Sequence, residues 1–457
     1  MDVDLRSFLS ELKNRGELLE VGEEVDTRFE ITAVLKEVLG EQGGPAVHFR
    51  NVRGYPGRSL AGNILASRRK MALALGCEVE GLRDTYIKKR FDSQAPVVWD
   101  GSAPAQKNVV DKDVDLLSLL PAPLFHQGDA GHYLTAGVLM ARDPLTNELT
   151  MSIHRMQLKG KNLLGINLAH PPMADYLKRA EHEGEPMQVA VALGLHPAEL
   201  LAAAVSLKAG MKSKVHLAGG LAGRPVALVK AKVIDLMVPA LAETILEGQL
   251  LSGIREAEGP FGESSGYYFK TESPVMEVQA VTSRKEPILS IIPPWGIEID
   301  IMLSLFGGGE LWQELHRVIP GVLDVAFLPG SLTFQGVIKV SKSLSKSDVR
   351  RLIHLALNLD RRLKHVIVVD EDVDIHNTRD VLWALGTRFH GSYDLVCLQE
   401  LEGYVIDPST EDGKTTKIGF DATARPDGPD SSRYQRITLP QKSVLRAREI
   451  LGKWPAE

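Results

Sequence analysis

Two glutamates stand five positions apart in a stretch that favours sharp turns, Glu258-Gly259-Pro260-Phe261-Gly262-Glu263. Proline fixes φ and lacks a backbone donor, while glycine permits backbone turns that other residues resist. Such a stretch can bring both carboxylates to one point, and paired carboxylates in different environments do acid chemistry near neutral pH. The alternative interpretation is a tight loop whose glutamates face water, as most surface glutamates do.

The elements that must position this stretch change character twice along the chain. Up to about residue 115, helical patterns such as that of residues 5–12 alternate with short strand-like runs. From Tyr133 the period becomes that of strands, and residues 136–141 and 149–157 predict a hairpin. Helix and strand alternate again after Gly307. The pattern predicts an α/β (α+β) protein of three domains with a β-rich, barrel-like middle: residues 1–115, 116–305 and 306–457.

Composition excludes several classes of protein. The chain has 457 residues, of which 44% are hydrophobic and 25% charged, as in a soluble globular protein. Its net charge of −6 argues against nucleic acid as a partner, because phosphate binding needs a concentrated basic face. The most apolar run, residues 189–207, is interrupted by His196, Pro197 and Glu199, so we expect no membrane span. The two distant cysteines suit a reducing, cytoplasmic location.

Three motifs, taken in order, resemble the UbiD family of decarboxylases. They are Met151-Ser152-Ile153-His154-Arg155, the glutamate stretch with Gly266-Tyr267-Tyr268 after it, and residues 380–388, Asp-Val-Leu-Trp-Ala-Leu-Gly-Thr-Arg. The resemblance implies an N-terminal α/β domain, a split β-barrel of flavin-reductase type that binds the flavin and carries the catalytic residues, and a C-terminal α/β domain for oligomerisation as a homodimer or homohexamer. It also implies reversible, non-oxidative decarboxylation of an α,β-unsaturated, aromatic or heteroaromatic carboxylic acid. The cofactor would be prenylated FMN, or FMN, supplied by a flavin prenyltransferase.

The resemblance assigns roles to individual residues. Arg155, Glu258 and Glu263 match the family's catalytic Arg-Glu-Glu network. The planar guanidinium of Arg155 can hold a substrate carboxylate or the neighbouring Glu258. Glu263 can then protonate the carbon that loses CO₂. The expected contacts of the flavin are Ser152, Ile153, His154, Arg155, His170, Ser206, Lys214 and Lys417.

One part of the family pattern is altered. The family binds the flavin phosphate through a divalent metal held by Asn, His and Glu, and the matching positions here are Thr150, His170 and Lys214. A divalent metal is therefore doubtful, because such ions prefer carboxylate oxygens, and His170 is the remaining candidate ligand. Three alternatives stay open: the lysines at 208, 212 and 214 replace the metal, flavin binding has been lost, or these lysines line a solvated loop.

Other candidates are weaker. The acidic run Asp370–His376 looks like a metal cluster, but capping and interface roles are favoured. Lys417 is either the family's lysine near the flavin phosphate or an exposed tail residue, and Phe261 and Trp295 are candidates for lining the substrate pocket. A different class of function also fits the altered pattern: a non-catalytic or accessory UbiD-like subunit of a larger carboxylase, without its own flavin.

Overall fold

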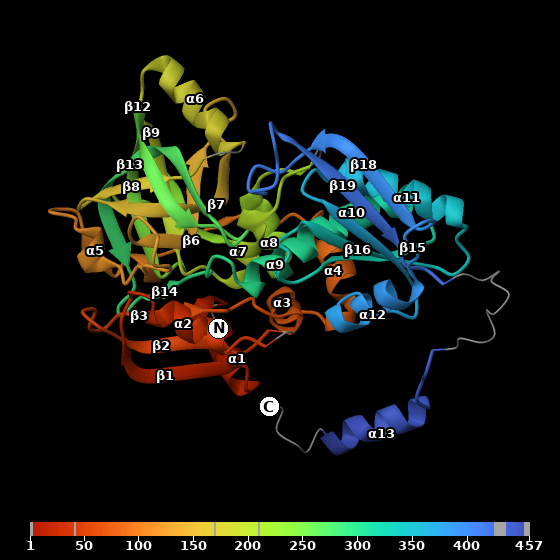
Figure 1. Ribbon diagram of the computed structural model, residues 1–457. Coiled ribbons are helices and arrows are strands. Elements are labelled where there is room, and N and C mark those ends of the chain that lie inside the picture. Colours follow the sequence, from red (N-terminus) through yellow and green to blue (C-terminus); the bar gives the residue numbers. More distant parts are fainter. Residues whose placement is uncertain (1–2, 41–42, 169–170, 209–210, 425–435, 452–457) are drawn as a thin grey trace.

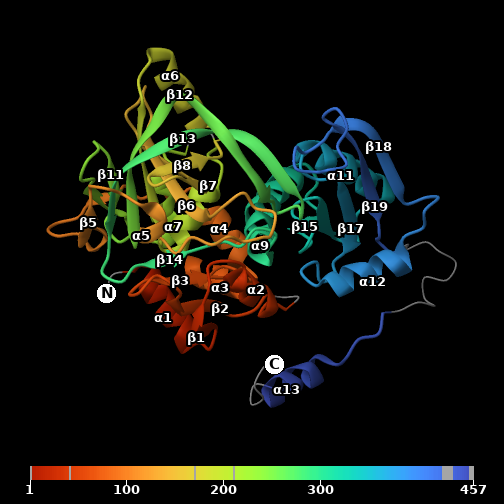
Figure 2. The same ribbon diagram turned by 60° about the vertical axis from the view of Figure 1, so that its left-hand side comes forward.

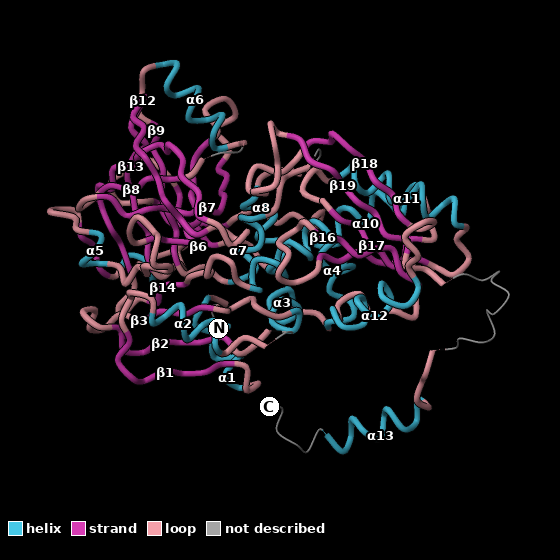
Figure 3. Tube along the Cα trace, in the orientation of Figure 1, coloured by secondary structure: helices cyan, strands magenta, loops and turns pink. Residues whose placement is uncertain are grey.

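A computed structural model of the chain describes residues 3–40, 43–168, 171–208, 211–424 and 436–451. Its elements form three main groups that the two ribbon views separate (Figure 1, Figure 2), and Figure 3 distinguishes their helices from their strands. The N-terminal group contains a sheet in the order β1-β2-β3-β14: Leu18–Val25, Ala46–Val52, Ser59–Gly62 and Ile288–Ser290. Its helices are α1 (Leu5–Asn14), α2 (Glu30–Glu37), α3 (Arg68–Leu75), a 3₁₀ turn (Val79–Gly81) and α4 (Leu82–Lys89).

The first helix shows why the sequence pattern works in this region. Leu5, Phe8, Leu9 and Leu12 are all buried on one face of α1, and the side chain of Asp4 accepts a hydrogen bond from the backbone N–H of Ser7. An apolar stripe with a capped N-terminus stabilises a helix against the core. The helix predicted from these spacings is therefore confirmed.

The middle group is built around a closed ring of strands. The ring runs β12-β9-β6-β7-β8-β13 and closes because β13 also pairs with β12, while β5 (Asn108–Val110) adds to the outer side of β13. The ring strands are β6 (Tyr133–Arg142), β7 (Leu149–Lys159), β8 (Leu163–Ile166), β9 (Met187–Leu193), β12 (Thr244–Gly262) and β13 (Tyr268–Ser283). The predicted hairpin is β6 and β7, which pair antiparallel. The barrel-like middle is confirmed, while its flavin-reductase subtype stays a prediction.

Both faces of the ring strands are covered. Val138 and Met140 of β6 enter one apolar cluster, and Leu139 and Ala141 enter another. Successive side chains of a strand point to opposite faces, so β6 is buried on both. The covering elements are α5 (Leu116–Leu119), α6 (Met173–Glu183), α7 (Pro197–Ala204), α8 (Lys214–Ala222), a 3₁₀ turn (Pro104–Gln106) and a small sheet of β4 (Val97–Val98), β10 (Ala227–Lys230) and β11 (Met237–Pro239).

The glutamate stretch differs from the irregular loop that its glycines and proline suggest. Glu258 to Gly262 form the end of the long strand β12, and the chain turns only at residues 263–267 before entering β13. The pairing of β12 with β13 is interrupted between Glu258 and Phe261, where Gly259 adopts a φ of +95°. The glycine and proline thus make a bulge inside a hairpin, because pairing with a neighbouring strand outweighs local propensity.

Segments cross between the groups, so the groups are not separate in sequence. β14 follows the ring strands along the chain but pairs parallel with β3 of the N-terminal sheet. In the opposite sense, β5 precedes residue 115 but pairs with β13 of the ring. The domain boundaries at residues 115 and 305 stay predictions.

The C-terminal group is a five-stranded sheet in the order β15-β16-β17-β19-β18: Val322–Phe327, Gln335–Val340, His365–Asp370, Lys414–Asp421 and Leu395–Glu402. Its helices are α9 (Ile297–Leu303), a π-helical turn (Ser304–Gly308), α10 (Gly309–Val318), α11 (Lys346–Leu359), α12 (Thr378–Arg388) and α13 (Gln441–Leu451). Gly307 allows a close approach, since a Cβ there would lie 2.7 Å from both Arg362 Nη2 and the Phe327 ring. In both ribbon views α13 lies apart from the three groups.

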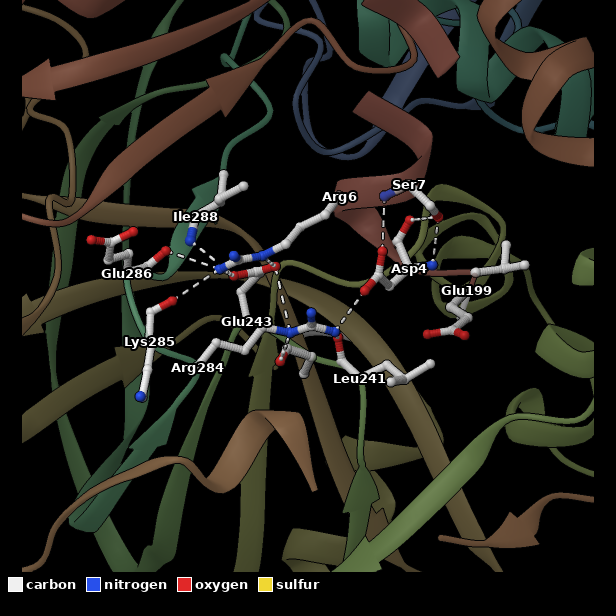
Figure 4. Close-up of polar contacts among 12 residues, drawn as sticks. Asp4, Arg6, Ser7, Glu199, Leu241, Glu243, Arg284, Lys285, Glu286 and Ile288 are labelled. Atoms are coloured by element: carbon white, nitrogen blue, oxygen red, sulfur yellow. Dashed lines mark hydrogen bonds and ion pairs between the residues drawn. The ribbon is translucent and has the colours of Figure 1, made fainter. Parts of the chain in front are cut away.

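An ion-pair network fastens the N-terminal helix to the ring (Figure 4). Arg6 of α1 donates from Nε and Nη2 to the two oxygens of Glu243, each at 2.8 Å. Arg284, which follows β13, pairs with Asp4 at 2.9 Å. Glu243 immediately precedes β12, so this network fixes the start of the strand whose far end carries Glu258. In the described part of the chain, no helix has the length and apolar character needed to cross a bilayer.

Candidate active site

Arg155 of β7 brings the two glutamates together. Its Nε and Nη2 donate to the two oxygens of Glu258 at 3.1 and 2.6 Å, and its Nη1 forms an ion pair with Glu263. The side chain of Glu258 is fully buried, whereas those of Arg155 and Glu263 keep 14% and 17% exposure. A planar guanidinium with a two-point contact is a well-defined partner for a carboxylate. The three residues predicted as catalytic therefore form one cluster.

The bulge in β12 separates the two glutamates while keeping both in reach of Arg155. A Cβ on Gly259 would lie 2.5 Å from the carbonyl oxygen of Phe269, so only glycine fits there. The N–H of Gly259 donates to Oε1 of Gln157, a residue of the same strand as Arg155, at 3.2 Å. β7 and the end of β12 are thus fixed to each other beside the cluster.

Glu263 opens a tight turn. Its N–H donates to the carbonyl of Tyr267 at 2.9 Å, its carbonyl accepts from the N–H of Gly266 at 2.9 Å, and its Oε2 accepts from the N–H of Ser264 at 3.2 Å. Trp295 lies against this turn, because a Cβ on Gly266 would be 3.3 Å from its indole. Trp295 is 55% exposed and has Lys36 Nζ 4.5 Å from its ring centroid, so it borders the turn from the solvent side.

Aromatic side chains form one wall of the cluster. The guanidinium of Arg155 lies 5.0 Å from the ring centroid of Phe261, and the rings of Phe261 and Tyr133 are 4.3 Å apart. Burial, followed by the nearby Glu258 carboxylate, raises the pKa of Tyr133. Phe261 was expected to line the substrate pocket, and it is buried against the guanidinium. Tyr133 was missed, because nothing in its sequence neighbourhood distinguishes it from an ordinary core tyrosine.

The predicted flavin contacts on β7 lie beside Arg155. Ser152 Oγ is 2.6 Å from His154 Nε2, and His154 Nδ1 is 2.8 Å from the carbonyl oxygen of Asn167. Ile153 is half-buried between them in sequence and packs against the core. These contacts orient the His154 ring. His170 lies outside the described residues.

Lys214 is the first residue of α8, and α8 packs against β7. Its ammonium is buried and donates to the carbonyl oxygen of Ala203 at 2.9 Å. Burial lowers the pKa of Lys214 to about 8. Of the other residues in this stretch, Ser206 and Lys212 are exposed, and Lys208 lies 3.7 Å from Glu310 and 3.9 Å from Glu314. Lys214 is therefore a buried cation with no carboxylate among its described contacts.

Thr150 and Lys214 form no divalent-metal site with the described residues, and the remaining candidate ligand, His170, lies outside them, so the loss of the metal stays a prediction. The described part of the chain contains no group of three His, Cys, Asp or Glu side chains placed to hold an ion. The hydroxyl of Thr150 is buried without a hydrogen-bond partner among the described residues, and Lys214 brings a positive charge instead of an anionic ligand. A buried ammonium does fit an anionic group such as a flavin phosphate, because it neutralises charge directly.

Two further candidates have partners in the C-terminal group. The buried ammonium of Lys417 donates to the carbonyl oxygens of Leu357 and Arg361, both at 3.1 Å, at the end of α11. A contact between Lys417 and a flavin stays a prediction. In the acidic run, Arg388 binds Asp370 at 3.1 Å and Asp372 at 2.6 Å, and the capping and interface roles stay a prediction.

Comparison with known proteins covers nearly the whole chain. The N-terminal, Rift-related and C-terminal domains of 3-octaprenyl-4-hydroxybenzoate carboxy-lyase, the UbiD domains, match residues 9–89, 97–296 and 301–422. A phenolic acid decarboxylase of Bacillus subtilis is 34% identical over 98% of this chain and 97% of its own. An anhydromevalonate phosphate decarboxylase of Methanothermobacter thermautotrophicus is 30% identical over 95% of this chain and 99% of its own.

Solved structures give the same result. HmfF, a UbiD-class enzyme from Pelotomaculum thermopropionicum in complex with FMN, matches with a TM-score of 0.91 and 34% identity over 98% of this chain and 99% of its own. An evolved dimeric form of that enzyme holds prFMN. The apo 3,4-dihydroxybenzoic acid decarboxylase AroY of Klebsiella pneumoniae matches with a TM-score of 0.92 and 30% identity over all of both chains.

Proposed function

The chain belongs to the UbiD family of carboxy-lyases, and from that premise we propose that it decarboxylates an aromatic, heteroaromatic or α,β-unsaturated acid, reversibly and without oxidation, using prenylated FMN. Relatives that act on phenolic and 3,4-dihydroxybenzoic acids support an aromatic substrate. The FMN and prFMN complexes of the Pelotomaculum enzyme support the flavin.

The observation that carries the proposal is one guanidinium, on β7, held between two carboxylates of the β12–β13 hairpin. Glu258 keeps Arg155 in place through a two-point contact, so Arg155 can exchange its contact with Glu263 for the carboxylate of a substrate. Glu263, which retains some exposure, can take up a proton from solvent when that exchange occurs. The arrangement therefore supplies a carboxylate anchor and a proton donor side by side.

The chemistry balances with these residues. The C–C bond to the carboxylate breaks, CO₂ leaves, and the electron pair stays with the carbon that carried it. A C–H bond forms when the Glu263 carboxyl gives its proton to that carbon, and solvent then returns a proton to Glu263. When bound, prenylated FMN supplies the electron sink for this electron pair. In the reverse direction Glu263 accepts the proton that the substrate carbon loses.

We further propose that Lys214 neutralises the flavin phosphate in place of a divalent metal. A phosphate carries close to two negative charges, and burying it unpaired costs several kcal/mol or more. Lys214 offers a buried ammonium without a carboxylate partner among the described residues, on a helix that packs against β7. The donor set around Thr150 and Lys214 does not suit a metal, so flavin binding should survive thorough chelation. Exchange of Lys214 for Glu should weaken flavin binding unless metal is added.

The test is to produce the protein together with a flavin prenyltransferase. Visible absorbance should show stoichiometric flavin, and the protein should release CO₂ from at least one acid of a panel that includes vanillic and 3,4-dihydroxybenzoic acids. Metal analysis after chelation, with the flavin still bound, tests the role of Lys214. Loss of the flavin on chelation, with recovery on adding Mg²⁺ or Mn²⁺, would contradict that role while leaving the decarboxylase intact.

The poor fit to a metal favours a second candidate, an accessory subunit of a larger carboxylase without its own flavin. A colourless, inactive protein that gains activity only with another subunit would support that candidate. The intact Arg155, Glu258 and Glu263 cluster argues against it, because a subunit without a flavin has no need of two carboxylates placed on one guanidinium. We also expect a homo-oligomer, a dimer or a hexamer; light scattering of the purified protein distinguishes them.

A further inference from the structure

The segment His126–Ala130, between α5 and β6, lies along the hairpin that carries the glutamates. Asp129 is its anchor: Oδ1 accepts the N–H of Gly262 at 2.8 Å, and Oδ2 accepts the N–H of His126 at 2.8 Å. The carboxylate of Asp129 has no exposed surface. Because Gly262 directly precedes Glu263, this contact holds the backbone at the base of the glutamate turn.

The same segment forms hydrogen bonds with both strands of the hairpin. The N–H of Ala130 donates to the carbonyl of Pro260 at 2.7 Å, and the N–H of Gly128 donates to the hydroxyl of Tyr268 at 3.0 Å. Pro260 lies at the end of β12 and Tyr268 at the start of β13. Together with the Asp129 contact, these bonds hold the residues on both sides of the turn 263–267.

The His126 ring fills the space that the absent side chain of Gly262 leaves. A Cβ on Gly262 would lie 2.6 Å from Nδ1 of His126. Both ring nitrogens are buried and make no hydrogen bond among the described residues, and Nδ1 is 3.7 Å from Oδ2 of Asp129. The ring therefore acts as packing against the hairpin, and the polar contacts come from Asp129 and the backbone.

We propose that Asp129 is a positioning residue for Glu263, and that His126–Ala130 is a clamp that fixes where the Glu263 carboxyl is presented. The inference rests on the proposed function, in which Glu263 transfers the proton. Apart from the clamp, the described contacts of the turn are its own hydrogen bonds, Trp295 and the ion pair of the Glu263 side chain with Arg155. Proton transfer needs heavy atoms within hydrogen-bond reach, and a displacement of about 1 Å can cost on the order of a hundredfold in rate.

The first test compares Asp129→Asn with Glu247→Gln. Glu247 is a control for the loss of a buried carboxylate: it is also buried, it lies on the hairpin strand β12, and its Oε2 accepts the N–H groups of Lys232 and Val233 at 2.7 and 2.8 Å. Asp129→Asn replaces one of two accepting oxygens and loses one backbone hydrogen bond, whereas in Glu247→Gln the amide oxygen can take the place of Oε2 and only the charge is lost. We expect Asp129→Asn to lower kcat by about 10- to 100-fold with KM within about threefold, and Glu247→Gln to leave both unchanged.

The second measurement does not depend on activity. Amide hydrogen exchange in peptides covering residues 258–268 should accelerate at least tenfold in Asp129→Asn and stay at the wild-type rate in Glu247→Gln, with or without flavin. Wild-type exchange and wild-type kcat in Asp129→Asn would overturn the proposal. Equal changes in both variants would also overturn it, because the effect would then be a general loss of stability.

A steric rescue separates the clamp from simple damage. Gly262→Ala places a methyl group against the His126 ring and should lower kcat as Asp129→Asn does. His126→Ala removes that ring, so the double variant should recover most of the lost kcat and the slow exchange. Failure of the double variant to recover either would contradict the clamp.

Glu263→Gln keeps the two proposals distinguishable. Loss of turnover in Glu263→Gln with normal turnover in Asp129→Asn refutes the clamp alone. Normal turnover in Glu263→Gln refutes the proposed role of Glu263, and the exchange measurement still reports whether Asp129 holds the turn.

Discussion

Two buried arginine–carboxylate networks lie at opposite ends of β12, and they differ in their charge balance. At the start of the strand, Arg6 makes a two-point contact with Glu243 (Figure 4). At its far end, Arg155 makes a two-point contact with Glu258. Both glutamates are fully buried, and both networks extend to a second carboxylate, Asp4 in the first and Glu263 in the second.

The first network is balanced and saturated. Arg6 and Arg284 match Glu243 and Asp4 in charge, and the N–H of Ile288 donates to Glu243 at 3.1 Å. The arginines also donate to backbone carbonyls, Arg6 to those of Lys285 and Glu286 and Arg284 to those of Leu241 and Ala242. A buried ion pair whose polar groups all have partners serves to hold two elements together, and we call this first network the joint.

The second network has one cation for two carboxylates. Arg155 contacts Glu258 and Glu263, and its remaining described neighbour is the face of the Phe261 ring. Glu263 is the more exposed of the two carboxylates, so it is the one that can reach solvent or a substrate. If Glu263 transfers the proton as proposed, the unequal number of cations and carboxylates, and not burial alone, distinguishes this network from the first.

The largest test of this difference is Glu263→Gln. Removing the proposed proton donor should lower kcat by ~10²–10⁴, while the melting temperature stays within a few degrees, because the site loses a surplus charge. Glu243→Gln is the matched exchange in the balanced network and should lower the melting temperature with little change in kcat per folded molecule. Turnover near wild type in Glu263→Gln would remove the distinction.

A second test breaks the balanced network. Arg6→Met leaves the buried Glu243 with Arg284, whose Nε is 3.6 Å from its nearer oxygen. Removing one partner of a buried pair costs about 3–5 kcal/mol, and the 39% exposure of Arg6 puts the expected loss of unfolding free energy nearer ~2–3 kcal/mol. Denaturant unfolding and kcat are the measurements. A fall in kcat larger than the fall in folded fraction would show that the joint also positions the site.

Much of the fold could be predicted from the sequence, because elements with one buried face show a regular spacing of apolar residues. The apolar spacing of residues 5–12 predicted α1, whose Leu5, Phe8, Leu9 and Leu12 are buried. The prediction was wrong where pairing between strands outweighs the conformational preference of individual residues. The glycines and proline after Glu258 suggested a loop, but Glu258, Phe261 and Gly262 pair with β13. β14, expected among the strands of the middle, joins the N-terminal sheet instead.

The site was predicted in part for a similar reason. Arg155, Glu258 and Glu263 lie in recognisable motifs, so the family resemblance supplied them. Tyr133 and Asp129 contact Phe261 and Gly262 only in the folded chain, and no spacing to a motif reveals them. The glycine-rich stretch around Asp129 was the one available signal, and on sequence grounds it predicts an ordinary turn.

A third test concerns Lys214, a buried cation that, unlike the arginines of the two networks, has no carboxylate among its described contacts. Its pKa falls from 10.5 to about 8 through burial, so the unfolded chain binds more protons between these values. The stability of the flavin-free protein should therefore rise with pH from about 8 to 10.5. Lys214→Met should abolish this rise and stabilise the flavin-free protein at neutral pH.

The same exchange should weaken flavin binding, because a bound phosphate needs the protonated ammonium. Wild-type affinity should fall as pH rises past about 8, while Lys214→Met should show lower affinity and little pH dependence. Thermal melts without flavin and flavin titrations at pH 7 and 9 are the measurements. Lys212→Met is the control, since Lys212 is exposed in the same stretch. Equal effects of the two exchanges would contradict the assignment.

The smallest expected effect concerns Tyr133, whose hydroxyl is a neutral group that could donate a hydrogen bond to Glu258 in the second network. Its hydroxyl is buried without a hydrogen bond of good geometry among the described residues, although the Glu258 carboxylate contributes to its raised pKa. If the hydroxyl donates nothing to Glu258, Tyr133→Phe removes an unsatisfied polar group and should be neutral or stabilising by ~1 kcal/mol. The ring remains to pack against Phe261, so kcat should change less than about threefold. A fall of tenfold or more in kcat, with an unchanged melting temperature, would show that the hydroxyl hydrogen-bonds Glu258 in the working enzyme, and that neutral donors as well as Arg155 hold the surplus charge.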